Sequence, residues 1–256
     1  MHSVEELWQR HHPAAGYPPG VIAVPAPIPG VAFFPGGYGL WRPEIGEPLP
    51  RPPIGQIMVL GHDFHSESGY LESIVRTRES ELQPTWRNLL DLFRRVGIAP
   101  ERCFFTNVYM GLRAGTRTAG PFPGASDAAF VAHCEVFLLE QLRVMRPSLI
   151  VTLGINVPPV LGRVVPGLKM WTEARGVRHL DATGPVQTQV EIPSDPTFRA
   201  TVVALIHPSL RHASLRHRHY RGMIGDAAEV RMLKDALASV NEKVSRHESA
   251  PRRLIP

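Results

Sequence analysis

Four short apolar runs constrain the fold of this 256-residue chain more than any other feature. They span residues 56–60, 103–108, 149–153 and 200–206. Runs that are apolar at every position are typical of parallel strands covered on both faces, because neither face of such a strand meets water. Residues 187–192 are a candidate for an extra strand. We therefore expect an α/β fold, a three-layer α/β/α sandwich around a short, mostly parallel four-stranded sheet.

Apolar residues at helical spacing separate these runs. One such stretch begins at Trp86 and stops before Gly97, a residue typical of helix ends. A second covers residues 130–145, and Ser126 is positioned to cap it. A third covers residues 230–240 near the end of the chain.

The two ends of the chain differ from this α/β pattern. Residues 1–54 are rich in Pro and Gly but also carry aromatic side chains, which disordered segments usually lack. We interpret them as an irregular arm wrapped on the core, with a free tail as the alternative. Residues 55–241 form the expected α/β domain, and residues 242–256 form a polar tail that we expect to fray.

Composition excludes several classes of protein. No stretch of about 18 apolar residues is present, so we expect no transmembrane helix, and the first residues show no secretory signal. The two cysteines, Cys103 and Cys134, are too few for a disulfide scaffold or for a four-cysteine zinc or iron–sulfur site. We expect a cytoplasmic protein without a cofactor. The net charge of +5, carried mostly by arginine, permits nucleic-acid binding without requiring it.

Polar residues follow each of the four apolar runs. The first is followed by Gly61, His62, Asp63, Phe64 and His65; the second ends at Asn107; the fourth is followed by His207. Ligands of open parallel sheets bind outside the carboxyl ends of the strands. The four strand ends therefore predict one shared crevice.

Each side chain in this group suits more than one purpose. Asp63 can orient a water or stabilise a cation, but it can equally be a turn residue. With His62 and His65 it can also be read as a metal site, although no third ligand stands at clear spacing. The Asn107 amide matches the donor–acceptor edge of a pyrimidine, or it satisfies loop backbone.

His207 stands before a proline, which holds its backbone extended. A neutral imidazole fixed there can donate to a developing oxyanion, or it is simply structural. The residues after it, 210–221, carry four arginines and three histidines. A loop with this composition can bind the phosphate backbone of a nucleic acid, but a loop that is merely exposed to solvent has the same composition.

From residue 57 to residue 221 the chain resembles the uracil-DNA glycosylase superfamily. Gly61-His62-Asp63-Phe64-His65 resembles the loop of that superfamily that activates water, and Phe105-Thr106-Asn107-Val108 with Arg113 resembles a base-reading strand and its following loop. Gln83-Pro84-Thr85-Trp86 resembles a segment that supplies an aromatic ring to the base pocket. Residues 146–154 and His207-Pro208-Ser209 resemble two further motifs, in the order of the family. The overall pattern is closest to the iron–sulfur branch, whose cluster cysteines this chain lacks.

The resemblance implies a role for each residue. Asp63 would position water and stabilise the sugar cation, and His207 would donate to the base oxygen. Asn107 would read the flipped base, Trp86 or Phe64 would stack on it, and Gly61, His62 and His65 would complete the base pocket. Leu210 or Arg211 would fill the gap in the duplex. DNA contacts would come from Ser209, Leu210, Arg211, Arg216, Arg218 and Arg113.

The function expected from these features is a metal-independent, monofunctional DNA glycosylase of base-excision repair. It would remove uracil or another deaminated base by base flipping, and we expect it to act as a monomer on damaged DNA, away from membranes. His62, Phe64 and His65 depart from the usual first motif, so the base is left open. Two alternatives stay open: a non-catalytic nucleic-acid-binding relative, and a metal-dependent hydrolase using His62, Asp63, His65 and His207.

Overall fold

The computed structural model describes residues 4–42, 46–193 and 195–248. Its central sheet has the strand order β3-β2-β5-β7-β6. The strands are β2 (Ile57–Gly61), β3 (Cys103–Asn107), β5 (Leu149–Leu153), β6 (Val186–Ile192) and β7 (Asp195–Leu205). All neighbours pair in parallel except β6, which runs antiparallel to β7. The α/β class and the mostly parallel sheet are confirmed.

The predicted count of four strands is one too few, because residues 186–192 form a fifth. Strand β6 lies at the edge of the sheet, and only Val190 and Ile192 of its residues are buried. An edge strand with one face exposed to solvent has no continuous run of apolar residues. A search for such runs therefore detects it poorly.

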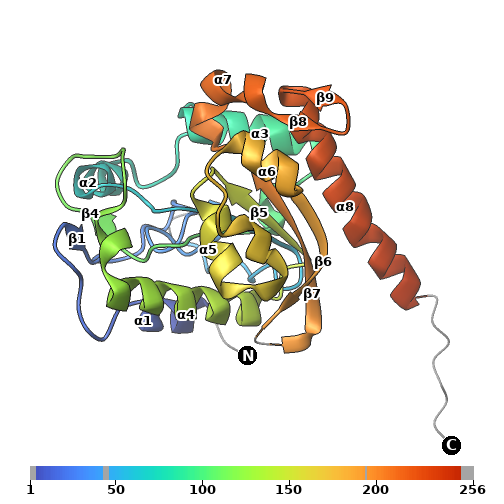
Figure 1. Cartoon of the computed structure of the whole chain (residues 1–256). Coiled ribbons are helices and arrows are strands. Elements are labelled where there is room, and N and C mark those ends of the chain that lie inside the picture. The colour runs from blue at the N-terminus through green and yellow to red at the C-terminus, as the bar shows by residue number, and fades with distance from the viewer. Residues whose placement is uncertain (1–3, 43–45, 194, 249–256) are drawn as a thin grey trace, which may run out of the picture.

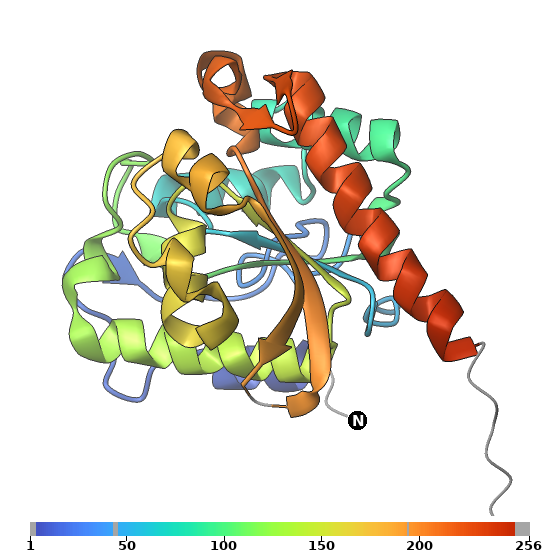
Figure 2. The same cartoon turned by 45° about the vertical axis from the view of Figure 1, so that its right-hand side comes forward.

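Helices cover both faces of the sheet (Figures 1 and 2). Val59 and Phe105 pack on one face in the same hydrophobic cluster as residues of α3 (Pro84–Val96) and α8 (Asp226–Glu248). Met58 and Phe104, one residue away along each strand, pack on the opposite face with α4 (Ala128–Met145) and α5 (Val157–Val164). The alternation follows from the two-residue repeat of a strand and gives the three expected layers.

Two helix boundaries test the sequence signals. Helix α3 ends as predicted at Gly97, which adopts a φ of 78°. Helix α4 is capped by Asp127 rather than Ser126, since the Asp127 carboxylate accepts from the backbone N of Phe130 at 2.8 Å. Ser126 instead ends a short 3₁₀ turn that begins at Pro123.

Smaller elements surround this framework. They are α1 (Val4–Arg10), β1 (Val21–Ile22), α2 (Glu67–Arg76), β4 (Leu112–Arg113), α6 (Val177–Thr183), α7 (Arg211–Ser214), β8 (His219–Tyr220) and β9 (Met223–Ile224). Within the described ranges, no helix combines the length and the apolar character needed to cross a membrane.

The arm of residues 1–54 packs on the core over its described part. Phe34 is fully buried, and its backbone N donates to the carbonyl of Phe105, while Phe105 N donates to the carbonyl of Gly39. The arm thus occupies the outer edge of β3. It is less irregular than expected, because α1 forms ahead of the first proline, Pro13.

The predicted polar tail begins too early. Helix α8 continues through residue 242 to Glu248, and residues 249–256 of the predicted tail lie outside the described part of the chain.

Candidate functional site

The parallel strands end in register at one edge of the sheet. Gly61 of β2 pairs with Asn107 of β3, Leu60 of β2 with Thr152 of β5, and Leu153 of β5 with Leu205 of β7. Neighbouring strands lie roughly 4.8 Å apart, so the loops after all four strands leave within a span of about 15 Å. The structure therefore brings the predicted strand ends together.

Asp63 lies two residues beyond β2, with its side chain 13% exposed. Its Oδ1 accepts from Arg113 Nε at 2.9 Å, and its Oδ2 accepts from Arg113 Nη2 at 3.0 Å and from His62 Nδ1 at 2.7 Å. Burial alone would raise the pKa of Asp63, but the hydrogen bonds from His62 and Arg113 outweigh it and hold this pKa below its ordinary value. The side chain is a carboxylate at neutral pH.

Arg113 does not lie on the surface, contrary to its prediction as a DNA contact. Its side chain is 5% exposed and is committed to Asp63 and to the carbonyls of Gly120 and Pro121. Its guanidinium carbon also lies 5.4 Å from the ring centre of Phe122. A guanidinium with these partners has no route to a phosphate, because its direction is already set by buried contacts.

The other residues of the Asp63 loop are partly exposed. The His65 ring turns toward α2, where its Nδ1 accepts from Ser66 N at 2.8 Å, and a Cβ on Gly69 would collide with it. Burial lowers the pKa of His65. The Phe64 ring packs against Gly36 of the arm in the same way. Both rings are held by packing contacts, which restricts how they can meet a base.

Asn107 is 2% exposed, and its amide is oriented by the arm. Its Nδ2 donates to the carbonyl of Phe34 at 2.9 Å, which directs Oδ1 toward Gly61. Any Cβ at position 61 would collide with that oxygen, so Gly61 is required here by close approach.

Trp86 is not a free stacking surface. It is 3% exposed, its Nε1 donates to Glu79 Oε2 at 2.7 Å, and its ring centre lies 4.7 Å from that of Trp41. The prediction that Trp86 stacks on a base is contradicted, because its faces are already occupied inside the core. A helical aromatic at the start of α3 is here a packing residue.

His207 follows β7 and is oriented by Ser209. Its Nδ1 lies 2.8 Å from Ser209 Oγ and accepts from Ser209 N at 3.3 Å, and with Nδ1 as the acceptor of both contacts the neutral ring carries its proton on Nε2. Burial lowers the pKa of His207, against an opposing effect of the nearby Asp63 carboxylate. Gly154, at a φ of 94°, closes the β5 turn beside the ring. The result is a neutral imidazole with Nε2–H as donor.

The loop after His207 divides into buried and exposed residues. Arg218 is fully buried, and its Nη1 donates to Asp181 Oδ1 at 2.7 Å. Arg211 is 7% exposed and bound to Glu229 and to Asp226. The predicted DNA contacts of Arg211 and Arg218 are therefore wrong, as is Arg211 as a wedge into the duplex, since both arginines form ion pairs that tie the loop to the protein. Three predicted contacts remain at the surface: Ser209, Leu210 at 56% exposed, and Arg216.

Several residues that shape the site went unnoticed in the sequence. Asn88 of α3 donates from Nδ2 to the carbonyl of Pro208 at 2.8 Å and so supports the His207 loop. Phe33 of the arm is partly buried, and its Cε1 would lie 3.6 Å from a Cβ at Gly61. No local signal links these residues to the site, because Asn88 is 120 positions away from Pro208 along the chain and Phe33 lies well before Gly61, in the arm.

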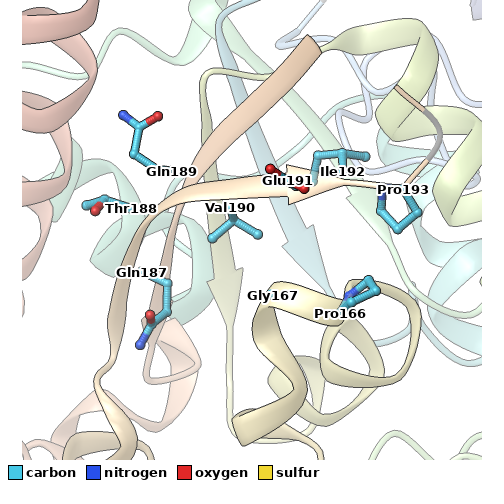
Figure 3. A pocket seen from close by; sticks show the side chains of 9 residues that line it. All are labelled: Pro166, Gly167, Gln187, Thr188, Gln189, Val190, Glu191, Ile192 and Pro193. Carbon is cyan, nitrogen blue, oxygen red and sulfur yellow. The ribbon is translucent and has the colours of Figure 1, made fainter. Parts of the chain in front are cut away.

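A hollow of about 410 Å³ lies elsewhere, along the β6 edge (Figure 3). It is lined by Pro166, Gly167, Gln187, Thr188, Gln189, Val190, Glu191, Ile192 and Pro193. Its lining carries a carboxylate and no cation, and none of the predicted site residues belongs to it. This hollow is a feature separate from the strand-end site.

No group of three or more His, Cys, Asp or Glu side chains placed to hold a metal ion occurs among the described residues. His62, Asp63, His65 and His207 accordingly do not form a metal-ligand set. His62 and His65 turn to different partners, namely Asp63 and Ser66.

A scan against protein-family models found no match, and a search of curated proteins found none.

Proposed function

We propose that this protein is a DNA glycosylase that removes uracil or another deaminated base flipped out of DNA. The observation that carries the proposal is the placement of Asp63 and His207 after two strands that end at the same edge of the sheet, near enough for the Asp63 charge to act on the pKa of His207. One is a carboxylate kept ionised by its neighbours, and the other is a neutral imidazole with a free Nε2–H. Breaking a glycosidic bond needs both groups, because positive charge develops on the sugar while negative charge develops on the base.

The proposed reaction uses these groups in sequence. The bond between the sugar C1′ and the base nitrogen breaks, and its electron pair goes to the base, where His207 Nε2–H stabilises the negative oxygen. Asp63 stabilises the cationic sugar and orients a water molecule. The water adds to C1′ and releases a proton to solvent, and the base anion takes up a proton, so the products are an abasic sugar with a hydroxyl at C1′ and a neutral free base.

Base recognition is assigned to Asn107. The bond to the Phe34 carbonyl fixes which end of the Asn107 amide is the donor, and an amide fixed in this way distinguishes uracil from cytosine, whose pairing edge is reversed. Because Asn107 is 2% exposed, this role requires the arm segment at Phe34 to move when a base enters. Stacking on the base falls to Phe33 or Phe64 rather than Trp86. Flipping costs a few kcal/mol, which stacking and contacts from Ser209, Leu210 and Arg216 would offset.

Base release from labelled oligonucleotides tests this function. Uracil, hypoxanthine and mismatched thymine would be placed in single and double strands and treated with alkali to cut at abasic sites. We expect cleavage at one base, lost in Asp63→Asn and His207→Ala and reduced in Asn107→Ala. Asp91→Asn, which removes a carboxylate from the 45%-exposed Asp91 on α3, is the matched control and should keep full activity.

Other outcomes would redirect the assignment. DNA binding without cleavage would favour the non-catalytic nucleic-acid-binding relative. If the protein neither cleaves nor binds DNA, the glycosylase and the non-catalytic binder are both rejected. Metal analysis of the purified protein would then be the next measurement. We further propose that the protein acts as a monomer, because a single chain supplies every group that the reaction needs, and that it works in the reducing cytoplasm, since Cys103 and Cys134 are both free thiols.

A further inference from the structure

Arg113 contacts Asp63 more extensively than any other described side chain. Two parallel N–H donors meet the two carboxylate oxygens, Nε to Oδ1 at 2.9 Å and Nη2 to Oδ2 at 3.0 Å. A bidentate pair of this kind fixes the plane of the carboxylate as well as its charge, which a single contact does not.

The guanidinium is itself held from several sides. Nη1 and Nη2 donate to the carbonyls of Pro121 and Gly120 at 2.9 and 3.1 Å. Its backbone N donates to the carbonyl of His65 at 3.0 Å, and β4 pairs with β1 of the arm, where Val21 stands opposite Arg113. The protein therefore fixes the position of the Arg113 guanidinium, and the guanidinium in turn fixes the position of the Asp63 carboxylate.

Counting lone pairs shows what this leaves for chemistry. A carboxylate offers about four acceptor positions, two on each oxygen. Oδ2 accepts from Arg113 and His62, and Oδ1 accepts from Arg113. One acceptor position remains, on Oδ1, so Asp63 can orient a single water from a single direction.

We propose that Arg113 is a positioning residue, which fixes the Asp63 carboxylate so that only one lone pair of Oδ1 remains for the attacking water. This inference rests on the proposed glycosylase activity. It also defines Asp63 as an orienting anion rather than a strong base, because three charge-assisted hydrogen bonds reduce its affinity for a proton.

The charge around Asp63 makes the inference testable by pH. The titratable and charged groups that interact with Asp63 are His62, His65, His207 and Arg113. Only Arg113 is charged at every pH of interest. In Arg113→Gln the pKa of Asp63 should rise, because the effect of burial is then opposed by His62 alone. The acidic limb of the profile of kcat/KM against pH should move to higher pH, with kcat about 100-fold lower at its optimum.

The experiment combines this profile with a direct titration. Asp63 is followed by its ¹³C carboxyl shift, assigned with Asp63→Asn, in the wild type, Arg113→Gln and Arg113→Lys. Arg113→Lys keeps the charge but loses the fork, so it should keep the wild-type acidic limb and still lose kcat. Arg163→Gln removes an exposed arginine from an ion pair with Glu135 and should match the wild type. Added guanidinium ion should partly restore Arg113→Ala.

Each outcome decides. A folded Arg113→Gln with the wild-type pH profile and carboxyl titration overturns the inference, and so does Arg113→Ala that gains nothing from guanidinium. If Arg113→Gln does not fold, Arg113→Lys decides: loss of kcat with an unmoved acidic limb supports positioning, and full activity refutes it. A wild type that releases no base overturns the proposed function, and the catalytic part of this inference with it, whereas the carboxyl titration still shows whether Arg113 holds Asp63.

Discussion

The Asp63 loop and the His207 loop use buried arginines in different ways. In the Asp63 loop, Arg113 binds the candidate catalytic carboxylate itself. In the His207 loop, Arg211 and Arg218 bind acidic residues of other elements, chiefly Glu229 of α8, and leave His207 free of them.

The difference lies in which carboxylate meets solvent. The side chain of Glu229 is fully buried, and its Oε1 also accepts from Ile206 N at 2.6 Å, so it joins α8 to the start of the His207 loop. The Asp63 side chain stays 13% exposed. In the His207 loop the arginine–carboxylate pairs are thus structural. In the Asp63 loop the pair keeps the partly exposed Asp63 side chain ionised. The predictions below test this contrast.

Glu229→Ala should have the largest effect, a loss of about 3–5 kcal/mol in the free energy of unfolding, since it leaves Arg211 and Arg218 buried without their shared anion. Urea unfolding measures the loss. Glu173→Ala is the control, because Glu173 is exposed and 3.8 Å from an exposed Arg175; it should change stability by less than about 1 kcal/mol. Equal losses in the free energy of unfolding of the two variants would contradict a structural role for the buried Glu229 ion pairs.

His207→Ala should lower kcat by about 100- to 1000-fold, the usual cost of removing one oxyanion donor. Its unfolding midpoint should stay near that of the wild type, because Arg211 and Arg218 hold the loop without His207. Single-turnover base release and thermal unfolding measure the two effects. His179→Ala on α6 is the matched control. A variant that loses stability and activity together would make His207 structural.

Asp63 should stabilise the fold at neutral pH and lose this effect in acid. Because its folded pKa lies below the ordinary value of 3.8, the stabilisation is present above pH 3.8 and is lost as pH falls through the lower folded pKa. Each unit of lowering is worth about 1.4 kcal/mol. Unfolding of the wild type and Asp63→Asn, compared between pH 6 and pH 2.5, should show a gap that narrows below pH 3.8. A constant gap would mean that Asp63 is not held as an anion.

Arg216→Ala should have the smallest effect, a decrease of about 0.9 in the slope of log binding constant against log salt, equivalent to one lost phosphate contact. Arg216 contrasts with Arg211 and Arg218 of the same loop, because we expect no phosphate contact from those two buried arginines. Fluorescence anisotropy on uracil-containing DNA measures the slope. Arg143→Ala, on the exposed side of α4, should leave the slope unchanged. An unchanged slope in Arg216→Ala would remove this loop from the DNA interface.

The fold was predictable where burial shows directly in composition. Strand β5 was located at its exact bounds, β2 and β3 within one residue, and β7 except for its first five residues, because residues between two helix layers are mostly apolar. The edge strand β6 was only a candidate, since the sequence of a strand that is half exposed to solvent resembles that of a loop. Asp127 and Ser126 are both good caps, and sequence could not choose between neighbours.

The candidate site was predictable in its positions and less so in its contacts. Asp63, Asn107 and His207 do gather at one edge, because parallel strands end together. The fate of the aromatic and basic residues depended on distant segments. Trp86 is enclosed by residues of the arm and of the loop before α3, namely Trp41, Phe33 and Glu79.

The sequence by itself determined the layered α/β architecture and the edge of the sheet where polar groups meet, because hydrophobic periodicity and strand ends are local properties. Only the tertiary structure decided which arginines of the His207 loop stay exposed and which are buried in ion pairs. Arg211, Arg216 and Arg218 look alike along the chain, and their roles separate only when Glu229, Asp226 and Asp181 arrive from elsewhere. A guanidinium pairs with whichever carboxylate the fold brings near it, and that partner is not written beside it in the sequence.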